Sequence, residues 1–481
     1  MRVSLTNPSW REEGRRGIRS GCRVPNIMGE RDFTFIPFPF PLAYAAAVLE
    51  ANGTPVMIVD AVGEDLVETE YLRRVASFAP DLIVNETSTA SFENDNRLAA
   101  NLKRQTGARI TLCGPHATGD PRGVLRDSGV DFVLLGEFEQ TLSELVRALD
   151  LSAPLSEIKG LAYRNANGEV VVNDRRPLLA DLDGLPWPHR ETLPLSSYRV
   201  GGYPPPVMYM YASRGCPYQC TFCLWPQTMY KSGSYRVRDL SCVVKEIENI
   251  QDRYGPFRSI YYDDDTFNID RRRMKELCRL LRHKPWRIPF GCNARADLFD
   301  EEMLMELSEV GLFNIRVGVE SGDPAIQKRI KKNLDLGTVR RCIDGAHRAG
   351  VKVHVTFTIG LSGESWDSVE RTVDFAKSIE PDSMAFTITT PFPGTEYYDE
   401  VVRDGLLTTS EWGRFNVVSS AVIRTEAMSA EEITQAERYV MRKVYYSPAF
   451  LVRRLKYATT LDELFALARK GVKLIAEGVG R

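Results

Sequence analysis

The stretch ASRGCPYQCTFCLWP, residues 212–226, places three cysteines close together: Cys216, Cys220 and Cys223, spaced C-x3-C-x2-C. Closely spaced thiolates select zinc, copper(I) or iron–sulfur clusters. A structural zinc site uses four protein ligands, usually in two close pairs, and here the other six cysteines are scattered singly along the chain. A [4Fe–4S] cluster held by three cysteines leaves one iron free to bind a substrate or cofactor. The spacing therefore favours such a cluster over a structural metal knuckle.

The pattern around the cysteines predicts an open barrel. From residue 207 onward, six apolar strands alternate with helices over roughly 190 residues, and the cysteine triplet follows the first strand. A complete (β/α)8 barrel needs about 250 residues and does its chemistry at the C-terminal ends of its strands. We therefore predict a partial (β/α)6 TIM-like barrel over residues 206–425, with its active site at those strand ends.

The N-terminal part shows a second alternation of strands and helices. Residues 1–150 contain continuously apolar strands, which is typical of a parallel sheet covered on both faces. This predicts a doubly wound, flavodoxin-like (Rossmann-like) domain, which binds ligands at the carboxyl ends of its strands. We expect a linker with a β-hairpin at residues 151–205 and a helical C-terminal region at 426–481, whose last helix packs on the barrel or touches a membrane surface.

Composition limits the function classes. The 481 residues carry 62 Lys+Arg and 64 Asp+Glu, a net charge of −2, so no basic field favours nucleic acid. The chain contains no apolar run long enough for a transmembrane helix and no secretory signal pattern at its N-terminus. Its nine cysteines are too scattered for a disulfide scaffold. These features indicate a cytoplasmic enzyme with reduced thiols.

The cysteine spacing on the first loop of a six-fold barrel, with Phe222 before the third cysteine, resembles the radical S-adenosylmethionine (SAM) superfamily. The resemblance implies that Cys216, Cys220 and Cys223 hold a [4Fe–4S] cluster whose open iron is chelated by SAM. Reductive cleavage of SAM then yields a 5′-deoxyadenosyl radical.

The resemblance also implies SAM-binding residues at later strand ends. An acidic element, 262–267, stands where the family usually has glycine-glycine-glutamate near the SAM amino group, and Arg295 is a candidate partner of the SAM carboxylate. The segments 318–322 and 359–364 look like the ribose and adenine elements of the family. The SAM-binding residues implied are Phe222, Asp263, Asp264, Asp265, Arg295, Glu320, Ser321 and Gly360.

The front domain is similar to the cobalamin (B12)-binding domain that precedes the barrel in one subgroup of this superfamily. The residues implied near cobalamin are Asn85, Gly114, His116, Gly136 and Glu137. Many cobalamin domains supply a histidine to cobalt from an Asp-x-His-x-x-Gly motif, whereas residues 60–65 here read DAVGED. We therefore expect cobalamin without a histidine ligand from that motif, and a vestigial cobalamin domain is the alternative.

The leading hypothesis is a cobalamin-dependent radical SAM methyltransferase that acts on an unactivated carbon or on phosphorus, since such cofactors carry the chemistry and the fold positions them. One alternative is a radical SAM cyclase or rearranging enzyme without methyl transfer, and another is an iron–sulfur redox sensor or binding module. We expect a small-molecule or lipid-like substrate and a flavodoxin- or ferredoxin-type reductant. The substrate itself cannot be read from the sequence.

Overall fold

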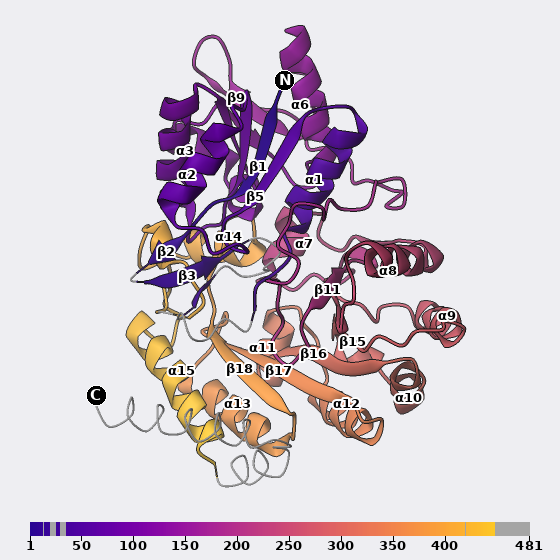
Figure 1. Cartoon of the computed structure of the whole chain (residues 1–481). Coiled ribbons are helices and arrows are strands. Elements are labelled where there is room, and N and C mark those ends of the chain that lie inside the picture. Colours follow the sequence, from indigo (N-terminus) through magenta and orange to yellow (C-terminus); the bar gives the residue numbers. More distant parts are fainter. Residues whose placement is uncertain (13, 20–25, 29–34, 419, 448–481) are drawn as a thin grey trace.

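The protein was analysed as a computed structural model, which describes residues 1–12, 14–19, 26–28, 35–418 and 420–447. The chain forms two α/β units, one above the other in the view of Figure 1. The helix predicted near the C-terminus, within residues 461–475, lies outside the described residues.

The N-terminal unit is built on a seven-stranded sheet of order β10-β9-β8-β7-β6-β1-β5. Its five parallel strands, numbered along the chain, lie in the order 2-1-3-4-5, which is the flavodoxin-like order and confirms the predicted fold. These strands are β1 (Val3–Asn7), β5 (Val56–Asp60), β6 (Leu82–Glu86), β7 (Arg109–Cys113) and β8 (Phe132–Leu134).

Helices cover both faces of this sheet, as its continuously apolar strands require. One face packs against α1 (Phe40–Ala51) and α6 (Glu139–Leu151), and the other against α2 (Glu68–Ser77) and α3 (Phe92–Thr106). The short helices α4 (Pro115–Gly119) and α5 (Pro121–Asp127) follow β7. A small antiparallel sheet of β2 (Arg11–Glu12), β3 (Arg15–Ile18) and β4 (Asn26–Met28) was not predicted.

The predicted hairpin is present as β9 (Leu161–Arg164) and β10 (Val170–Val172). Strand β9 pairs antiparallel with β8, so the hairpin extends the N-terminal sheet. This part of the segment that we expected to be a linker is therefore part of the front domain.

The second unit is a six-stranded parallel sheet whose strands neighbour one another in chain order, β11-β14-β15-β16-β17-β18. Its two end strands, β11 and β18, do not pair with each other in the described part of the chain, so the barrel is open as predicted. The strands are β11 (Val207–Met210), β14 (Ser259–Tyr262), β15 (Phe290–Ala294), β16 (Leu312–Glu320), β17 (Lys352–Ile359) and β18 (Ser383–Ile388).

Side-chain caps start most of the barrel helices. Asp239, Asp270, Asp300, Asp335 and Ser365 each accept a hydrogen bond from a backbone N–H of the first helical turn, which satisfies donors that the helix itself leaves unpaired. The helices are α8 (Leu240–Tyr254), α9 (Arg271–Arg282), α10 (Glu301–Glu309), α11 (Pro324–Arg329), α12 (Leu336–Arg348), α13 (Trp366–Ser378) and α14 (Glu396–Arg403).

Helix α15 (Ala430–Tyr445) lies beside the last strand (Figure 1), and the Tyr445 hydroxyl donates to the Met384 carbonyl at 2.6 Å. Covering an edge strand in this way protects its backbone groups from pairing with another chain. In the described ranges, no helix combines the length and apolar character needed to cross a membrane.

Candidate active site

The cysteine loop lies between two short strands. β12 (Ser213–Gly215) pairs antiparallel with β13 (Tyr235–Val237), and helix α7 (Leu224–Thr228) begins directly after Cys223. Gly215 has φ +88°, and a Cβ there would stand 2.4 Å from the Ser234 carbonyl oxygen, so only glycine fits before Cys216. The three cysteines form no disulfide and are half-buried, so a cofactor can reach their thiols.

One side chain holds the backbone of this loop. The Gln227 Nε2 group donates to the carbonyl oxygens of Cys220 (3.1 Å), Thr221 (3.0 Å) and Cys223 (2.9 Å). Its Oε1 accepts from the Glu396 backbone N–H at 2.9 Å, which connects the loop to α14. No pattern in the sequence singles out this glutamine, because it binds backbone atoms of residues four to seven positions away.

The donor set fits an iron–sulfur cluster. Burial raises the pKa of the Cys220 thiol, with Lys332 and Arg295 acting in the opposite direction, and burial also raises the pKa of Cys223. A bound metal deprotonates such thiols outright. Within the described ranges, no three His, Cys, Asp or Glu side chains surround a single ion position. Each cysteine of a [4Fe–4S] cluster binds a different iron, so three half-buried thiols on one loop suit it.

The three consecutive aspartates take different positions after β14. Asp264 accepts from the Ala212 backbone N–H at 2.9 Å and from the Ser213 hydroxyl at 2.5 Å, so it joins β14 to the strand before the cysteines. Asp265 is half-buried, accepts from the Gly215 N–H at 3.0 Å and lies close enough to Cys223 to raise its pKa. Asp263 is buried. Of the three, Asp265 is the best placed to reach a ligand on the cluster.

Glu320 ends β16 with φ +71° and forms a pair that the sequence did not reveal. Its Oε1 lies 3.2 Å from Lys332 Nζ, and its Oε2 accepts from the Thr358 hydroxyl at 2.9 Å. Burial acts to lower the pKa of Lys332, but Glu320 and Cys220 together raise it above its usual value. Because Lys332 also lowers the pKa of Cys220, this ammonium group lies near the cluster loop. It is a candidate for the SAM carboxylate.

Arg295, the carboxylate partner predicted from the sequence, is occupied. Its guanidinium makes two hydrogen bonds to Asp297, at 3.0 and 2.8 Å, and lies 3.7 Å above the Tyr218 ring. The structure thus brings Arg295 beside the cluster loop, but with its charge already paired.

Three other predicted SAM residues have packing contacts. Ser321 is fully buried, with its hydroxyl 3.3 Å from that of Thr372. Gly360 has φ +90°, and a Cβ there would stand 2.7 Å from Ile433 of α15. Phe222 packs against a small apolar cluster formed by Ile326, Ile330 and Leu361.

At the edge of the front domain, Asn85 and His116 are buried. Asn85 Oδ1 accepts from the Thr6 hydroxyl at 2.6 Å, while its Nδ2 has no hydrogen-bond partner among the described residues. A buried donor without an acceptor is the kind of group that a polar ligand satisfies, which fits the expected cobalamin. Burial lowers the pKa of His116 to about 3, so its ring is neutral, and Nδ1 lies 3.2 Å from the Thr89 hydroxyl.

The segment that replaces the histidine motif is structural. Asp60 accepts from Asn7 Nδ2 at 2.7 Å, the Gly63 N–H at 2.9 Å and the Tyr198 hydroxyl at 3.0 Å. Gly114 has φ +104°, and a Cβ there would stand 2.5 Å from the Thr87 carbonyl oxygen. These contacts fix the turns at the carboxyl ends of β5 and β7.

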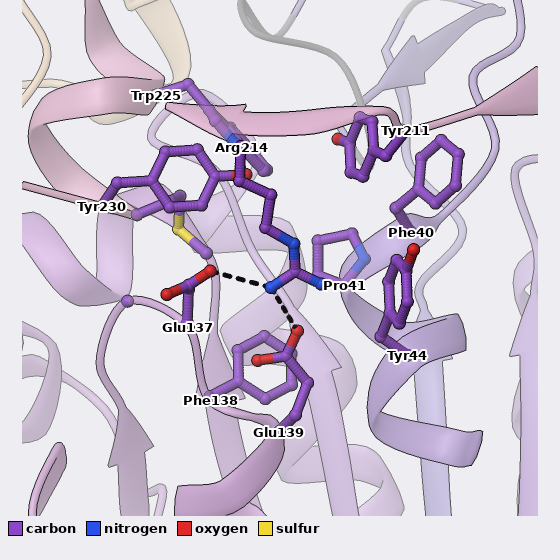
Figure 2. A pocket seen from close by; sticks show the side chains of 12 residues that line it. Phe40, Pro41, Tyr44, Glu137, Phe138, Glu139, Tyr211, Arg214, Trp225 and Tyr230 are labelled. Carbon is purple, nitrogen blue, oxygen red and sulfur yellow. Dashed lines mark hydrogen bonds and ion pairs between the residues drawn. The ribbon is translucent and has the colours of Figure 1, made fainter. Parts of the chain in front are cut away.

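Glu137 forms ion pairs across the boundary between the two units. Its carboxylate binds Arg214 at 2.8 Å and Arg236 at 2.7 Å, and Glu139 binds Arg214 at 2.9 Å. Figure 2 shows the Arg214 guanidinium between the two carboxylates, in a pocket that also includes Tyr44 and Tyr230. Burial acts to lower the pKa of Arg214, but the two glutamates raise it well above its usual value.

The carboxyl edges of both sheets face each other at this boundary. Gly136 lies next to α7, where a Cβ would stand 3.1 Å from the Met229 carbonyl oxygen, and Gly119 touches the loop at Pro393. The His116 ring meets Trp412 edge-on at 5.1 Å between centroids. The front-domain residues predicted near cobalamin therefore lie against the barrel unit, and Gly136 lies next to the helix that follows the cluster loop.

Comparisons with known proteins support this arrangement. Residues 210–376 match the family model of the radical SAM superfamily, and residues 31–146 match that of the B12 binding domain. A protein of Pyrococcus horikoshii named an uncharacterized methyltransferase is 30% identical over 418 residues, covering 86% of this chain and 89% of that protein.

Two relatives with specific names are more distant. Cytidylyl-2-hydroxyethylphosphonate methyltransferase of Streptomyces wedmorensis is 27% identical, covering 78% of this chain and 79% of the relative. Anaerobic magnesium-protoporphyrin IX monomethyl ester cyclase of Rubrivivax gelatinosus is 26% identical, covering 88% and 76%.

Among solved structures, the radical SAM methyltransferase TsrM of Kitasatospora setae, with cobalamin and a [4Fe–4S] cluster bound, has the same fold. Its TM-score is 0.69 at 16% identity, with all of both chains covered. The matched domains, the cysteine loop and the relative in Pyrococcus together show that the chain belongs to the radical SAM superfamily, in the group that carries a B12-binding domain.

Proposed function

We propose that this radical SAM enzyme is a cobalamin-dependent methyltransferase that methylates a carbon or phosphorus atom of a small molecule. The observation that carries the proposal is the Arg214–Glu137 ion pair, because Arg214 stands two residues before Cys216 and Glu137 ends the strand-edge loop after β8. It holds the predicted cobalamin edge against the cluster loop. When bound, the cluster and SAM supply a 5′-deoxyadenosyl radical, and cobalamin supplies a methyl group.

The chain's own residues would bind and orient. Cys216, Cys220 and Cys223 would hold the cluster, on a loop whose carbonyl groups Gln227 fixes. Asp265 would accept from the SAM amino group, and the ammonium group of Lys332, positioned by Glu320, would bind the SAM carboxylate. Asn85, Gly114, His116 and Gly136 would line the cobalamin side. In this proposal, Asp264, Ser321 and Arg295 support the site through other residues.

The cellular setting follows from the same proposal. A reducing, cytoplasmic environment would keep the three thiols available for the cluster, and a flavodoxin- or ferredoxin-type protein would deliver the electron. The near-neutral net charge of −2 gives no support for a nucleic-acid substrate.

A second candidate, cyclisation or rearrangement without methyl transfer, is favoured by the similarity to the cyclase of Rubrivivax gelatinosus. One experiment separates the two. Anaerobically reconstituted protein, loaded with hydroxocobalamin, is incubated with SAM and titanium(III) citrate. Formation of S-adenosylhomocysteine that depends on cobalamin, together with 5′-deoxyadenosine, supports methyl transfer. 5′-Deoxyadenosine without S-adenosylhomocysteine would instead support a cyclase or rearranging enzyme.

A further inference from the structure

One face of strands β16, β17 and β18 is polar and half-exposed, while the other is apolar and buried. The alternation is regular in β17, where His354, Thr356 and Thr358 are half-exposed between buried Val353, Val355, Phe357 and Ile359. In β18, Ser383, Ala385 and Thr387 repeat the pattern. In β16, Arg316 and Gly318 do so.

The strand register aligns these residues in rows. Arg316 pairs with His354, which pairs with Ser383, and Gly318 pairs with Thr356, which pairs with Ala385. The His354 Nδ1 atom lies 2.8 Å from the Ser383 hydroxyl. The polar face thus runs from the Arg316 row to the carboxyl strand ends.

The apolar face is turned to the helices. Phe357 meets Phe375 of α13 edge-on at 6.4 Å, and α12 and α13 lie on the outer side of these strands (Figure 1). The polar face is therefore the barrel interior. Barrel interiors are usually filled with layers of bulky Val, Ile and Leu. Here threonine, serine and glycine occupy many of those positions, so the interior presents hydrogen-bonding groups where bulky apolar side chains would otherwise pack.

The upper end of this face meets the candidate SAM site. A Cβ on Gly318 would stand 2.2 Å from Glu320 Oε1 and 3.1 Å from Lys332 Nζ, so both side chains lie over Gly318. Thr358 donates to Glu320 Oε2 at 2.9 Å. Any molecule bound along the face would have one end at the Glu320–Lys332 pair.

The lower end carries a guanidinium group. Arg316 is half-exposed, its guanidinium carbon lies 5.9 Å from the centre of the Phe35 ring, and among the described residues no carboxylate forms an ion pair with it. Arg214 and Arg295, by contrast, are fully committed to carboxylates. A guanidinium group without a carboxylate is suited to bidentate binding of a carboxylate or phosphate group.

We propose that the interior face of β16–β18 binds the substrate, and that the substrate is a polar small molecule with a carboxylate or phosphate group held by Arg316. Arg316 and Glu320 are four positions apart on β16, so their Cα atoms lie about 13 Å apart, and the anionic group and the reacting atom would lie toward opposite ends of that span. This inference rests on the proposed function, which places the reacting atom at that end. It selects against a purely apolar, lipid-like substrate.

The test uses three probes of one chain length: sorbitol 6-phosphate, gluconate and neutral sorbitol. Binding to the cluster-loaded protein is measured by equilibrium dialysis up to 10 mM probe, about the range of weak ligand fragments. We expect at least one anionic probe to bind and sorbitol not to bind. Comparing sorbitol 6-phosphate with gluconate shows whether the site prefers a phosphate or a carboxylate group.

Arg316→Gln should weaken binding of that anionic probe about ten- to hundred-fold, because a charge-assisted hydrogen-bond pair is lost. Arg316→Lys should restore part of the affinity, and Arg279→Gln, on the outer surface of α9, should bind like wild type. Iron content of each variant shows that the cluster loop is intact.

Binding of sorbitol as tight as that of the anions, no binding of any probe, or unchanged binding by Arg316→Gln would overturn the inference. Cleavage of SAM by the wild-type protein is scored separately. Its absence would refute the proposed function and leave the anion site standing.

Discussion

The carboxyl ends of the two sheets face each other but are built differently. At the barrel, the cysteines and Asp265 are half-buried, and the loop that carries them is held through its backbone by Gln227. At the front domain, Asn85 and His116 are 0% and 2% exposed, and each is within hydrogen-bond distance of a neighbouring threonine hydroxyl. The cluster cysteines of the barrel edge are thus partly open to solvent, whereas the front edge buries Asn85 and His116 among its own turns.

This difference separates residues that share a predicted role. Asp264 and Asp265 are adjacent in sequence, yet one joins two strands and the other lies beside the cluster loop. Glu137, predicted to lie near cobalamin, is bound to two arginines of the barrel unit. Proximity to a strand end therefore identifies the site, and the hydrogen-bond partners decide which residues remain for a ligand.

The largest effect is expected at the barrel edge. Cys223→Ala should remove one cluster ligand and lower the rate of 5′-deoxyadenosine formation more than about 1,000-fold, on the scale of losing an essential catalytic group. Iron and sulfide analysis gives the cluster content. Cys242→Ala, a half-buried cysteine on α8, is the matched control and should keep the cluster. A Cys223→Ala protein that still cleaves SAM would rule out this ligand set.

The junction between the edges should be the most sensitive point for stability. Arg214→Gln leaves Glu137 and Glu139, 9% and 8% exposed, without their shared counter-charge. Breaking a buried pair in this way costs roughly 3–5 kcal/mol, to be measured as the free energy of unfolding in urea. Arg236→Gln leaves Glu137 paired with Arg214 and should cost less. Equal losses of unfolding free energy in the two variants would show that Arg214 contributes no more to stability than Arg236.

Glu364, the last residue of the predicted adenine segment, should make stability depend on pH. Burial raises its pKa to about 8 in the folded protein, against 4.5 for an ordinary glutamate. A raised folded pKa gives stability that is fully present below pH 4.5 and is lost as pH rises through 8. The loss is up to about 5 kcal/mol, at 1.36 kcal/mol per pKa unit.

Glu364→Gln should remove this dependence, so wild type should lose stability relative to the variant between pH 5 and 8.5. Urea unfolding at several pH values measures it. Parallel pH profiles for the two proteins would mean that Glu364 ionises normally.

The two aspartates sharpen the comparison further. Asp265→Asn should weaken SAM binding about ten-fold, equivalent to 1.4 kcal/mol, and leave the unfolding free energy nearly unchanged. Asp264→Asn should do the reverse, lowering stability by about 1–3 kcal/mol through lost hydrogen bonds to buried groups. Isothermal titration with SAM and urea unfolding test both, and the opposite pattern would exchange the two roles.

The smallest effect is expected at the front edge. Asn85→Ala removes one buried amide donor and should weaken cobalamin retention by roughly five-fold, as for one hydrogen bond. Corrin absorbance after desalting measures retention. Because His116 has a pKa of about 3, it stays neutral, and retention should show no step from its titration between pH 5 and 8. If Asn85→Ala retains as much cobalamin as wild type, the Asn85 amide does not bind cobalamin.

The sequence by itself determined the architecture and predicted the cluster ligands. Continuously apolar strands predicted the front sheet, and six strand–helix repeats predicted the barrel. Three cysteines at fixed spacing predicted a cluster site, because these signals depend on residues that are near one another in the chain. It did not reveal three contacts between residues that are distant in the chain. Lys332 pairs with Glu320, 12 residues away, Gln227 binds Glu396, 169 residues away, and Arg214 pairs with Glu137, 77 residues away.

Only the tertiary structure decided these contacts, and with them which strand-end residues remain for ligands. A carboxylate in a sequence carries the same letter whether its oxygens accept from a neighbouring strand or from a cofactor. Which of the two it does is set by the atoms that folding brings within about 3 Å of it. Asp264 and Asp265 differ in that respect alone.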